Sequence, residues 1–210
     1  MLLQPLTDQL WLGLLLVALL YALDYQLTLV GQRWHRRGAD AYYTLQGSYE
    51  LNPPFVDDVE SSRRISFKHI LAIGRIWLVL ALVWWFTTVY LDFPDIYLGA
   101  VGFFVLLQFP VLMRHVQNVV LFRFVVLRGG VEGRTTAARW LDLKVTAAIF
   151  FYFAAAYLVL WLLLGSAFFL GGVLGSLLAG ARFWIFGDEA EEEEGQADET
   201  ADTLTSPPTP

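Results

Sequence analysis

The chain has 210 residues, of which 57% are hydrophobic and only 16% charged, and it has a formal net charge of −6 and no cysteine. Soluble domains usually contain about a quarter charged residues, so this composition indicates a single membrane domain. The missing cysteine excludes disulfides, thiolate metal sites and a cysteine nucleophile. The net charge averages two unlike parts, because residues 188–210 hold nine acidic residues and no basic one, which leaves 14 basic and 11 acidic residues in 1–187.

Five apolar stretches are long enough to cross a bilayer as helices. In chain order they are 10–30, 70–91, 96–113, 145–164 and 167–186. The last two belong to one apolar region that would be about 60 Å long as a single helix, twice the hydrocarbon thickness, so we expect it to fold back at Gly165-Ser166. The first stretch has no basic residue before it and is too long for a signal-peptide core, so we expect it to be retained. The sequence predicts an all-α polytopic transmembrane helix bundle.

The segments between and after the spans are polar. Residues 31–69 are the longest such segment, in which Asn52-Pro53-Pro54 predicts a turn and 55–65 a short surface helix. Residues 114–139 are expected to form a loop, because their longest apolar piece is too short to cross. The acidic, Pro/Thr-rich tail 188–210 is predicted to be disordered, since it has too few apolar groups to order itself.

Lysine and arginine predict the orientation of the chain. The segment before the first span contains no lysine or arginine. The first and third loops contain six and five of them, and the second and fourth loops contain none. Basic loops stay in the cytoplasm, so we predict a multi-pass plasma-membrane protein with its N-terminus outside and its tail in the cytoplasm. The chain has twelve arginines but only two lysines. With the acidic tail, this usage is typical of GC-rich genomes and of halophilic organisms.

Two ionisable residues lie inside predicted spans, where a charge costs a few kcal/mol and needs a partner or a task. Asp24 lies seven residues before Gly31, and Arg75 lies seven residues after Lys68. Both are therefore about 10 Å from the same end of consecutive, antiparallel helices. We predict an Asp24–Arg75 ion pair, which either fastens the two helices or forms part of a site for an ion or a small polar ligand.

Further polar residues are expected in the same half of the membrane. They are Gln108, Arg114, His115, Asn118, Asp142, Lys144 and Arg182. Long side chains near helix ends reach the interface, which explains Arg114, Lys144 and Arg182 without a functional role. We interpret His115 as an interfacial polar residue rather than a proton relay.

The last predicted span has small residues at four-residue spacing, namely Ala167, Gly171, Gly175 and Ala179. Small residues at this spacing let helix backbones approach closely in lipid. We predict that Gly171, Gly175 and Ala179 form a helix-packing face within the bundle. The alternative is a homo-oligomer that forms through this helix.

The polar segments contain no specific catalytic motif. Asp57, Asp58 and Glu60 supply the oxygen ligands that a hard cation prefers, but three acidic residues are also common in a solvated loop. The sequence has no zinc-ligand spacing, no phosphate-binding glycine-rich loop and no nucleophile elbow. We therefore predict no metal, no cofactor and no nucleic-acid partner.

One arrangement of residues resembles a known family. Leu23-Asp24 and Leu27-Thr28 are followed by Gly31, then Glu50-Leu51-Asn52-Pro53, and then Phe67-Lys68. This order resembles a family of small prokaryotic membrane proteins of unknown function with an Asp-x-x-x-Thr, a Glu-x-Asn-Pro and a Lys motif. The resemblance covers about residues 20–70 and implies no activity. It implies a site composed of Asp24, Thr28, Glu50, Asn52 and Lys68.

Read physically, this set forms a charge network together with Arg75. Asp24 and Thr28 are one helical turn apart and share a face, and the turn at Asn52-Pro53 can direct Glu50 back toward the helix ends. Three functions remain open. The network is structural in an integral membrane protein, or it binds or carries a small polar solute, an ion or a lipid headgroup, or the protein is a lipid-modifying enzyme. We favour the structural role and no enzymatic activity.

Overall fold

The computed structural model describes residues 3–45, 50 and 53–205. Within these residues, five helices are long and apolar enough to cross a membrane. They are α2 (Leu10–Arg36), α4 (Phe67–Trp84, continued in π-helical geometry by η3, Trp85–Tyr90), α5 (Asp95–Arg128), α6 (Arg139–Leu164) and α7 (Ala167–Thr205). The structure is 84% helical, so the predicted all-α bundle with five membrane-spanning helices is confirmed.

Short elements occupy the polar segments. They are α1 (Gln4–Asp8), η1 (Ala39–Ala41), β1 (Tyr43–Leu45), η2 (Pro53–Phe55), α3 (Val56–Glu60) and β2 (Thr135–Ala137). β1 and β2 pair in parallel with Tyr43 opposite Thr135, and Arg134 Nε donates a hydrogen bond of 2.7 Å to Thr44 Oγ1. The two long connections are thereby tied together. We call this end of the bundle the loop end, and the opposite end, with the connections 91–94 and 165–166, the turn end.

Local chemistry explains where two of the long helices begin and end. Ser66 caps the N-terminus of α4, where its hydroxyl accepts a hydrogen bond of 3.1 Å from the backbone N–H of His69. Gly165 ends α6 with φ of +63°, a left-handed conformation that glycine adopts without a steric penalty. The chain therefore reverses at Gly165 and Ser166, the position at which the turn was predicted.

Two helices are longer than predicted. α5 was expected to end at residue 113 but continues to Arg128, because residues 114–128 contain neither proline nor glycine. α7 continues through Thr205, whereas disorder was predicted from residue 188. Alanine and glutamate are strong helix formers, and they extend a helix that is already nucleated in the apolar part of the chain. The remainder of the predicted tail, 206–210, lies outside the described residues.

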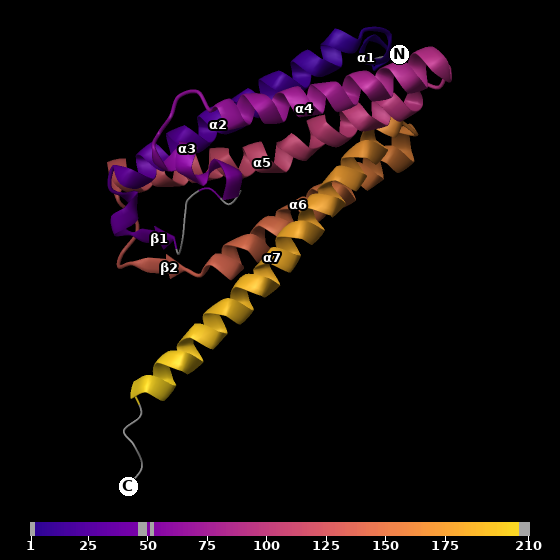
Figure 1. Ribbon diagram of the computed structural model, residues 1–210. Coiled ribbons are helices and arrows are strands. Elements are labelled where there is room, and N and C mark those ends of the chain that lie inside the picture. Colours follow the sequence, from indigo (N-terminus) through magenta and orange to yellow (C-terminus); the bar gives the residue numbers. More distant parts are fainter. Residues whose placement is uncertain (1–2, 46–49, 51–52, 206–210) are drawn as a thin grey trace.

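The long helices form two groups, which Figure 1 shows as two arms. α2, α4 and α5 make the first arm, and the hairpin of α6 and α7 makes the second. α7 packs extensively against both α6 and α5, whereas α5 and α6 have few contacts. The arms meet at the turn end and diverge toward the loop end (Figure 1).

Glycines set the close contact between the arms. A Cβ atom at Gly171 of α7 would overlap a backbone carbonyl oxygen of α5, and one at Gly102 of α5 would overlap a backbone carbonyl oxygen of α7. Gly175 also lies against α5, while Ala179 further along the row borders a cavity. The small residues at Gly171 and Gly175 are therefore packed within the bundle, where they allow the helix backbones to touch.

The buried apolar core lies where the arms meet. Its fully buried members include Val17 of α2, Leu80 of α4 and Tyr97 and Val101 of α5, and Phe168 of α7 joins them. Many other large apolar side chains of the long helices are exposed, as expected for helices whose solvent is lipid. The apolar packing is thus concentrated toward the turn end.

Candidate functional site

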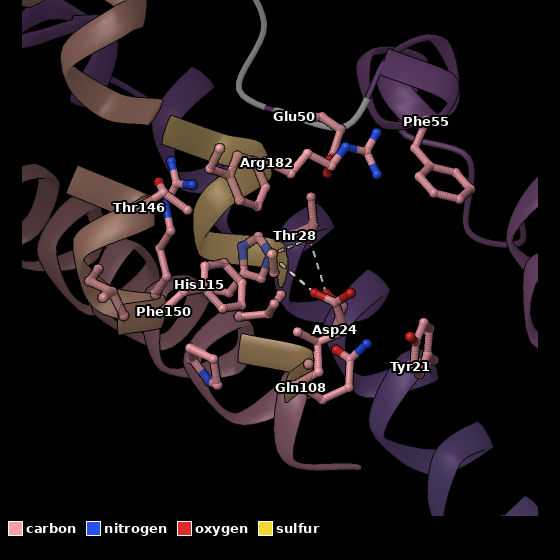
Figure 2. Close-up of a pocket in the computed structure, with 18 of the residues that line it drawn as sticks. Tyr21, Asp24, Thr28, Glu50, Phe55, Gln108, His115, Thr146, Phe150 and Arg182 are labelled. Atoms are coloured by element: carbon pink, nitrogen blue, oxygen red, sulfur yellow. Dashed lines mark hydrogen bonds and ion pairs between the residues drawn. The ribbon is translucent and has the colours of Figure 1, made fainter. Parts of the chain in front are cut away.

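A cavity of about 480 Å³ lies between the two arms, in the half of the bundle nearer the loop end (Figure 2). Ligand pockets in proteins are typically about 300–1,000 Å³, so the cavity could hold a small molecule or a headgroup. All five long helices line it. Its polar side chains are Asp24, Thr28, Glu50, His69, Gln108, Arg114, His115, Asn118, Thr146 and Arg182, and aromatic and aliphatic side chains form the remainder of the wall.

A hydrogen-bonded contact between an aspartate and a histidine on two different helices lies in the wall of the cavity. Asp24 Oδ1 of α2 lies 3.0 Å from Nε2 of His115 on α5, and the two side chains are only 20% and 16% exposed. Thr28, one turn after Asp24, places its Oγ1 3.2 Å from the same nitrogen and donates a hydrogen bond to the Asp24 backbone carbonyl. Since an ionised carboxylate can only accept a hydrogen bond, Nε2 is the protonated nitrogen of this imidazole.

Two polar atoms of the wall lack a hydrogen-bond partner within the described part of the chain. One is Nδ1 of His115, and the other is Oε1 of Gln108, a residue that is only 4% exposed. Both residues belong to α5 and are two helical turns apart, so they face the same side of that helix. Buried polar atoms are nearly always paired with protein groups or ordered water, so these two atoms call for a partner inside the cavity, either water or a ligand.

The cavity is also lined by two guanidinium groups that differ in their partners. Arg114 donates a hydrogen bond of 2.7 Å to Asp142 Oδ2 and thereby joins α5 to α6. Arg182 of α7 has its guanidinium carbon 5.1 Å from the ring centroid of Phe186, and no hydrogen bond or ion pair joins it to another described residue. Figure 2 shows the side chains of Arg182 and Glu50 on the same side of the cavity. Arg182 is therefore a cation that remains available to a ligand.

Aromatic rings close the cavity between α2 and α4. The ring of His69 stacks on Tyr25 at 4.9 Å between centroids and meets the edge of Phe55 at 5.5 Å. His69 Nε2 lies 2.9 Å from the backbone oxygen of Tyr21, and the Tyr25 hydroxyl donates to the backbone oxygen of Arg63 at 2.7 Å. These contacts hold the long connection before α4 against the first helix.

The structure brings together only part of the predicted site. Asp24, Thr28 and Glu50 all line the cavity, whereas Asn52 lies outside the described residues. Arg75 is exposed on α4 and does not pair with Asp24. The predicted Asp24–Arg75 ion pair is therefore wrong. The hydrogen bonds of His69 to Tyr21 and of Trp77 to Leu14 set the register of α2 and α4, which puts Arg75 roughly 12 Å along the axis from the level of Asp24, on the side of α4 that faces away from α2.

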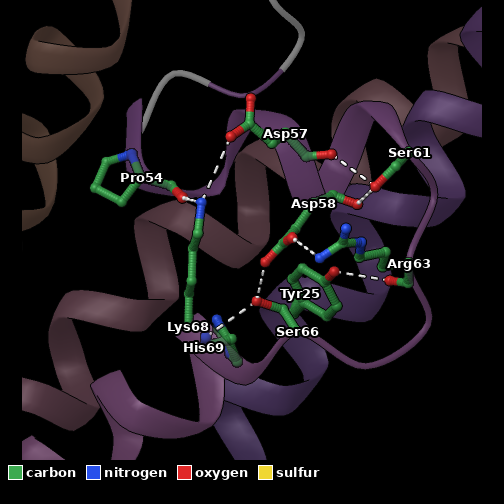
Figure 3. Close-up of polar contacts among 9 residues, drawn as sticks. All are labelled: Tyr25, Pro54, Asp57, Asp58, Ser61, Arg63, Ser66, Lys68 and His69. Atoms are coloured by element: carbon green, nitrogen blue, oxygen red, sulfur yellow. Dashed lines mark hydrogen bonds and ion pairs between the residues drawn. The ribbon is translucent and has the colours of Figure 1, made fainter.

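Lys68 also lies outside the cavity, among the polar contacts of the connection before α4 (Figure 3). Its Nζ donates a hydrogen bond of 3.1 Å to the Pro54 carbonyl and lies 3.6 Å from Asp57 Oδ2. Asp58 is turned inward, where it is 2% exposed and pairs with Arg63 at 3.1 Å. The two neighbouring carboxylates thus have separate partners, and the described residues contain no group of three side chains suited to a metal ion.

Sequence reasoning assigned Arg114 and His115 to the membrane interface. Gln108, Arg114, His115 and Asn118 all border the cavity, the last three because α5 continues past residue 113. Their spacing contains the signal, since positions 108, 115 and 118 fall on one face of a helix. That face becomes visible only once the helix is known to extend this far.

Comparisons with known proteins do not assign the chain to a family. Neither a protein-family model, nor a curated protein, nor a solved structure matches the chain.

Proposed function

We propose that this integral membrane protein binds the polar headgroup of an amphiphilic molecule in the cavity between its arms. The observation that supports this most directly is the pair of buried, unpartnered atoms, Gln108 Oε1 and His115 Nδ1, in the cavity wall. Each such atom costs the folded protein about 1–3 kcal/mol, which a ligand that hydrogen-bonds to both atoms would recover.

The distribution of side chains along the cavity supports an amphiphilic ligand. Charged groups gather toward the loop end, whereas Phe103, Leu107 and Leu178 line the part nearer the middle of the bundle. A headgroup would therefore lie beside Asp24 and Arg182, with an apolar chain between the arms, where burial of each CH₂ group contributes about 0.8 kcal/mol.

The charges of the lining favour a headgroup that offers both signs of charge. Asp24 and Glu50 supply carboxylates and Arg182 supplies a guanidinium, whereas Arg114 is already paired with Asp142. A ligand with a net charge would leave that charge uncompensated in a medium of low dielectric constant, which is costly. A zwitterionic headgroup avoids this cost.

We further propose that the loop end faces the cytoplasm of a cell whose plasma membrane contains the protein. The basic residues of the two long connections support this orientation, since basic loops stay on the cytoplasmic side. The cavity would then open in the inner half of the bilayer. Membership of the prokaryotic family and homo-oligomer formation through α7 stay predictions.

A purely structural role for the polar network is the second candidate. Two polar contacts between helices favour it, because Asp24–His115 joins α2 to α5 and the Arg114–Asp142 ion pair joins α5 to α6. Such pairs hold helices in register even when no ligand is bound. They do not provide a partner for Gln108 Oε1, which is why we place ligand binding first.

Native mass spectrometry on protein extracted in a mild detergent tests the proposal. Ala179→Phe would put a ring into the cavity, whereas Ala155→Phe makes the same change at an exposed position of α6. We expect one bound amphiphile on the wild type and on Ala155→Phe, and loss of that mass from Ala179→Phe in protein that keeps the helical circular dichroism spectrum of the wild type. Equal retention by all three proteins, or none by the wild type, would contradict ligand binding.

A further inference from the structure

Arg75 is a charged residue on the lipid-facing side of the bundle. It is exposed on α4, and no hydrogen bond or ion pair connects it to the part of the chain that the structure describes. α4 is also the most peripheral of the long helices, since only 11% of the most apolar part of its span is buried. Neither the cavity nor the core therefore explains this residue.

The depth of Arg75 makes its lack of a partner costly. It lies eight residues after Phe67, the first residue of α4, which is roughly 12 Å along the axis. The span Phe67–Tyr90 has 24 residues and a length of roughly 36 Å, against about 30 Å for the hydrocarbon core. If the span is centred in the core, Arg75 lies roughly 9 Å inside its edge, where an unpaired charge is unfavourable.

The surroundings of Arg75 have the pattern of a helix-packing face. Three exposed leucines lie on the same side of α4 as Arg75. Leu71 comes four residues before it, Leu78 three residues after it and Leu82 seven residues after it, spacings that share one helix face. Beside them, a Cβ atom at Gly74 would have no neighbour within 4 Å. A small residue next to an apolar stripe lets a second helix approach closely in lipid. We call these five residues the α4 outer face.

The charge restricts which helix can cover this face. A symmetric dimer of the chain would bring the same patch of both copies together, and thus one guanidinium toward another. The hydrogen bond of Trp77 to Leu14 places Arg75 level with a part of α2 that has no acidic residue, and Asp24 and Asp142 are already paired inside the bundle with His115 and Arg114. A symmetric second copy would therefore present a guanidinium, rather than a carboxylate, to Arg75.

We propose that the α4 outer face binds a transmembrane helix of another protein, and that an Asp or Glu of that helix pairs with Arg75. The pair would remove the cost of both buried charges, while the leucines and Gly74 provide the packing. This interaction surface lies outside the cavity, so it is independent of the proposed ligand binding.

The chain has no cysteine, so a single fluorescent donor can be attached at Glu60→Cys, an exposed position before α4. The probes are leucine-rich transmembrane peptides with an acceptor dye and one Glu, or one Gln in its place, roughly 9 Å inside one end. Energy transfer in phosphatidylcholine vesicles measures their association. We expect the Glu peptide to bind the wild type at least about tenfold more tightly than the Gln peptide.

Matched variants identify the residue responsible. Arg75→Gln should abolish the preference for the Glu peptide, and Arg75→Glu should transfer it to a Lys peptide, whereas Arg123→Gln, an exposed arginine of α5, should leave it intact. Equal binding of both peptides by the wild type, or no binding, would overturn the proposal and indicate that Arg75 reaches lipid phosphate instead. Self-association is tested with two labelled copies of the chain. If energy transfer occurs between the copies and Arg75→Gln abolishes it, the proposed partner helix would be replaced by a second copy of the chain.

Discussion

Asp24 Oδ1 on α2 lies 3.0 Å from Nε2 of His115 on α5, and this contact joins the first and third spans beside the cavity. It replaces the predicted contact with Arg75. The pair is mostly buried, so either residue alone would leave an uncompensated polar group in the membrane. Both the stability of the bundle and the polarity of the cavity depend on this pair.

We predict that Asp24→Asn and His115→Gln each lower the free energy of unfolding by about 1–3 kcal/mol. The double variant should lose less than the sum of the two, by about 0.6 kcal/mol or more, because interhelical pairs in membranes are typically of that strength. A double-mutant cycle on thermal stability in one detergent measures this difference. The matched cycle of Asp24→Asn with Arg75→Gln should be additive. Additivity of the first cycle would show that the two residues do not interact.

The glycine contact between the arms gives a second prediction. Gly171→Ala should destabilise the protein by about 1–3 kcal/mol, because the new methyl group would overlap the backbone of α5. Gly74→Ala on α4 meets nothing within 4 Å and should stabilise it by about 0.5–1 kcal/mol through helix propensity. Melting temperatures of the two variants in the same detergent test this. Similar shifts for both would mean that the helices are not in contact at Gly171.

The extended end of α7 is tied to α6 through Lys144. Its Nζ lies 3.0 Å from Asp188 and also contacts Glu191. Asp188→Asn with Glu191→Gln should lower the melting temperature at low ionic strength, and about 1 M salt should remove most of the difference by screening. Glu192→Gln with Glu193→Gln changes two exposed neighbours and should have no effect. An equal loss of melting temperature in both double variants would mean that the substitutions act through helix propensity and not through the ion pairs with Lys144.

The predicted orientation places the turn end outside the cell. Reporter fusions within residues 93–95 and after residue 205 should therefore localise to opposite sides of the membrane, with the second in the cytoplasm. This expectation follows from five spans and from the basic residues of the long connections. If both reporters were found on one side, the chain would cross the membrane an even number of times between them.

The spans could be predicted from the sequence because each is a continuous apolar run. The register between neighbouring helices and the rotation about each helix axis could not. Arg75 lies roughly 12 Å along the axis from the level of Asp24 and on the far side of α4, because packing between the helices decides both. His115 was assigned to the interface because the span was ended at residue 113, whereas the absence of glycine and proline as far as Arg128 lets α5 continue. Helix length, more than hydropathy, determined which polar residues reach the cavity.

Gln108→Leu gives the most direct test of ligand binding, because it removes the unpartnered buried Oε1 at nearly constant volume. If Gln108 serves a ligand, the variant without ligand should melt at the same temperature as the wild type or higher, since an unsatisfied buried group has been removed. Its affinity for a zwitterionic lysophospholipid, measured from the ligand-induced rise in melting temperature, should fall about tenfold or more, the equivalent of one lost hydrogen bond. A variant that melts lower than the wild type and keeps the full response to the lysophospholipid would contradict ligand binding in this cavity.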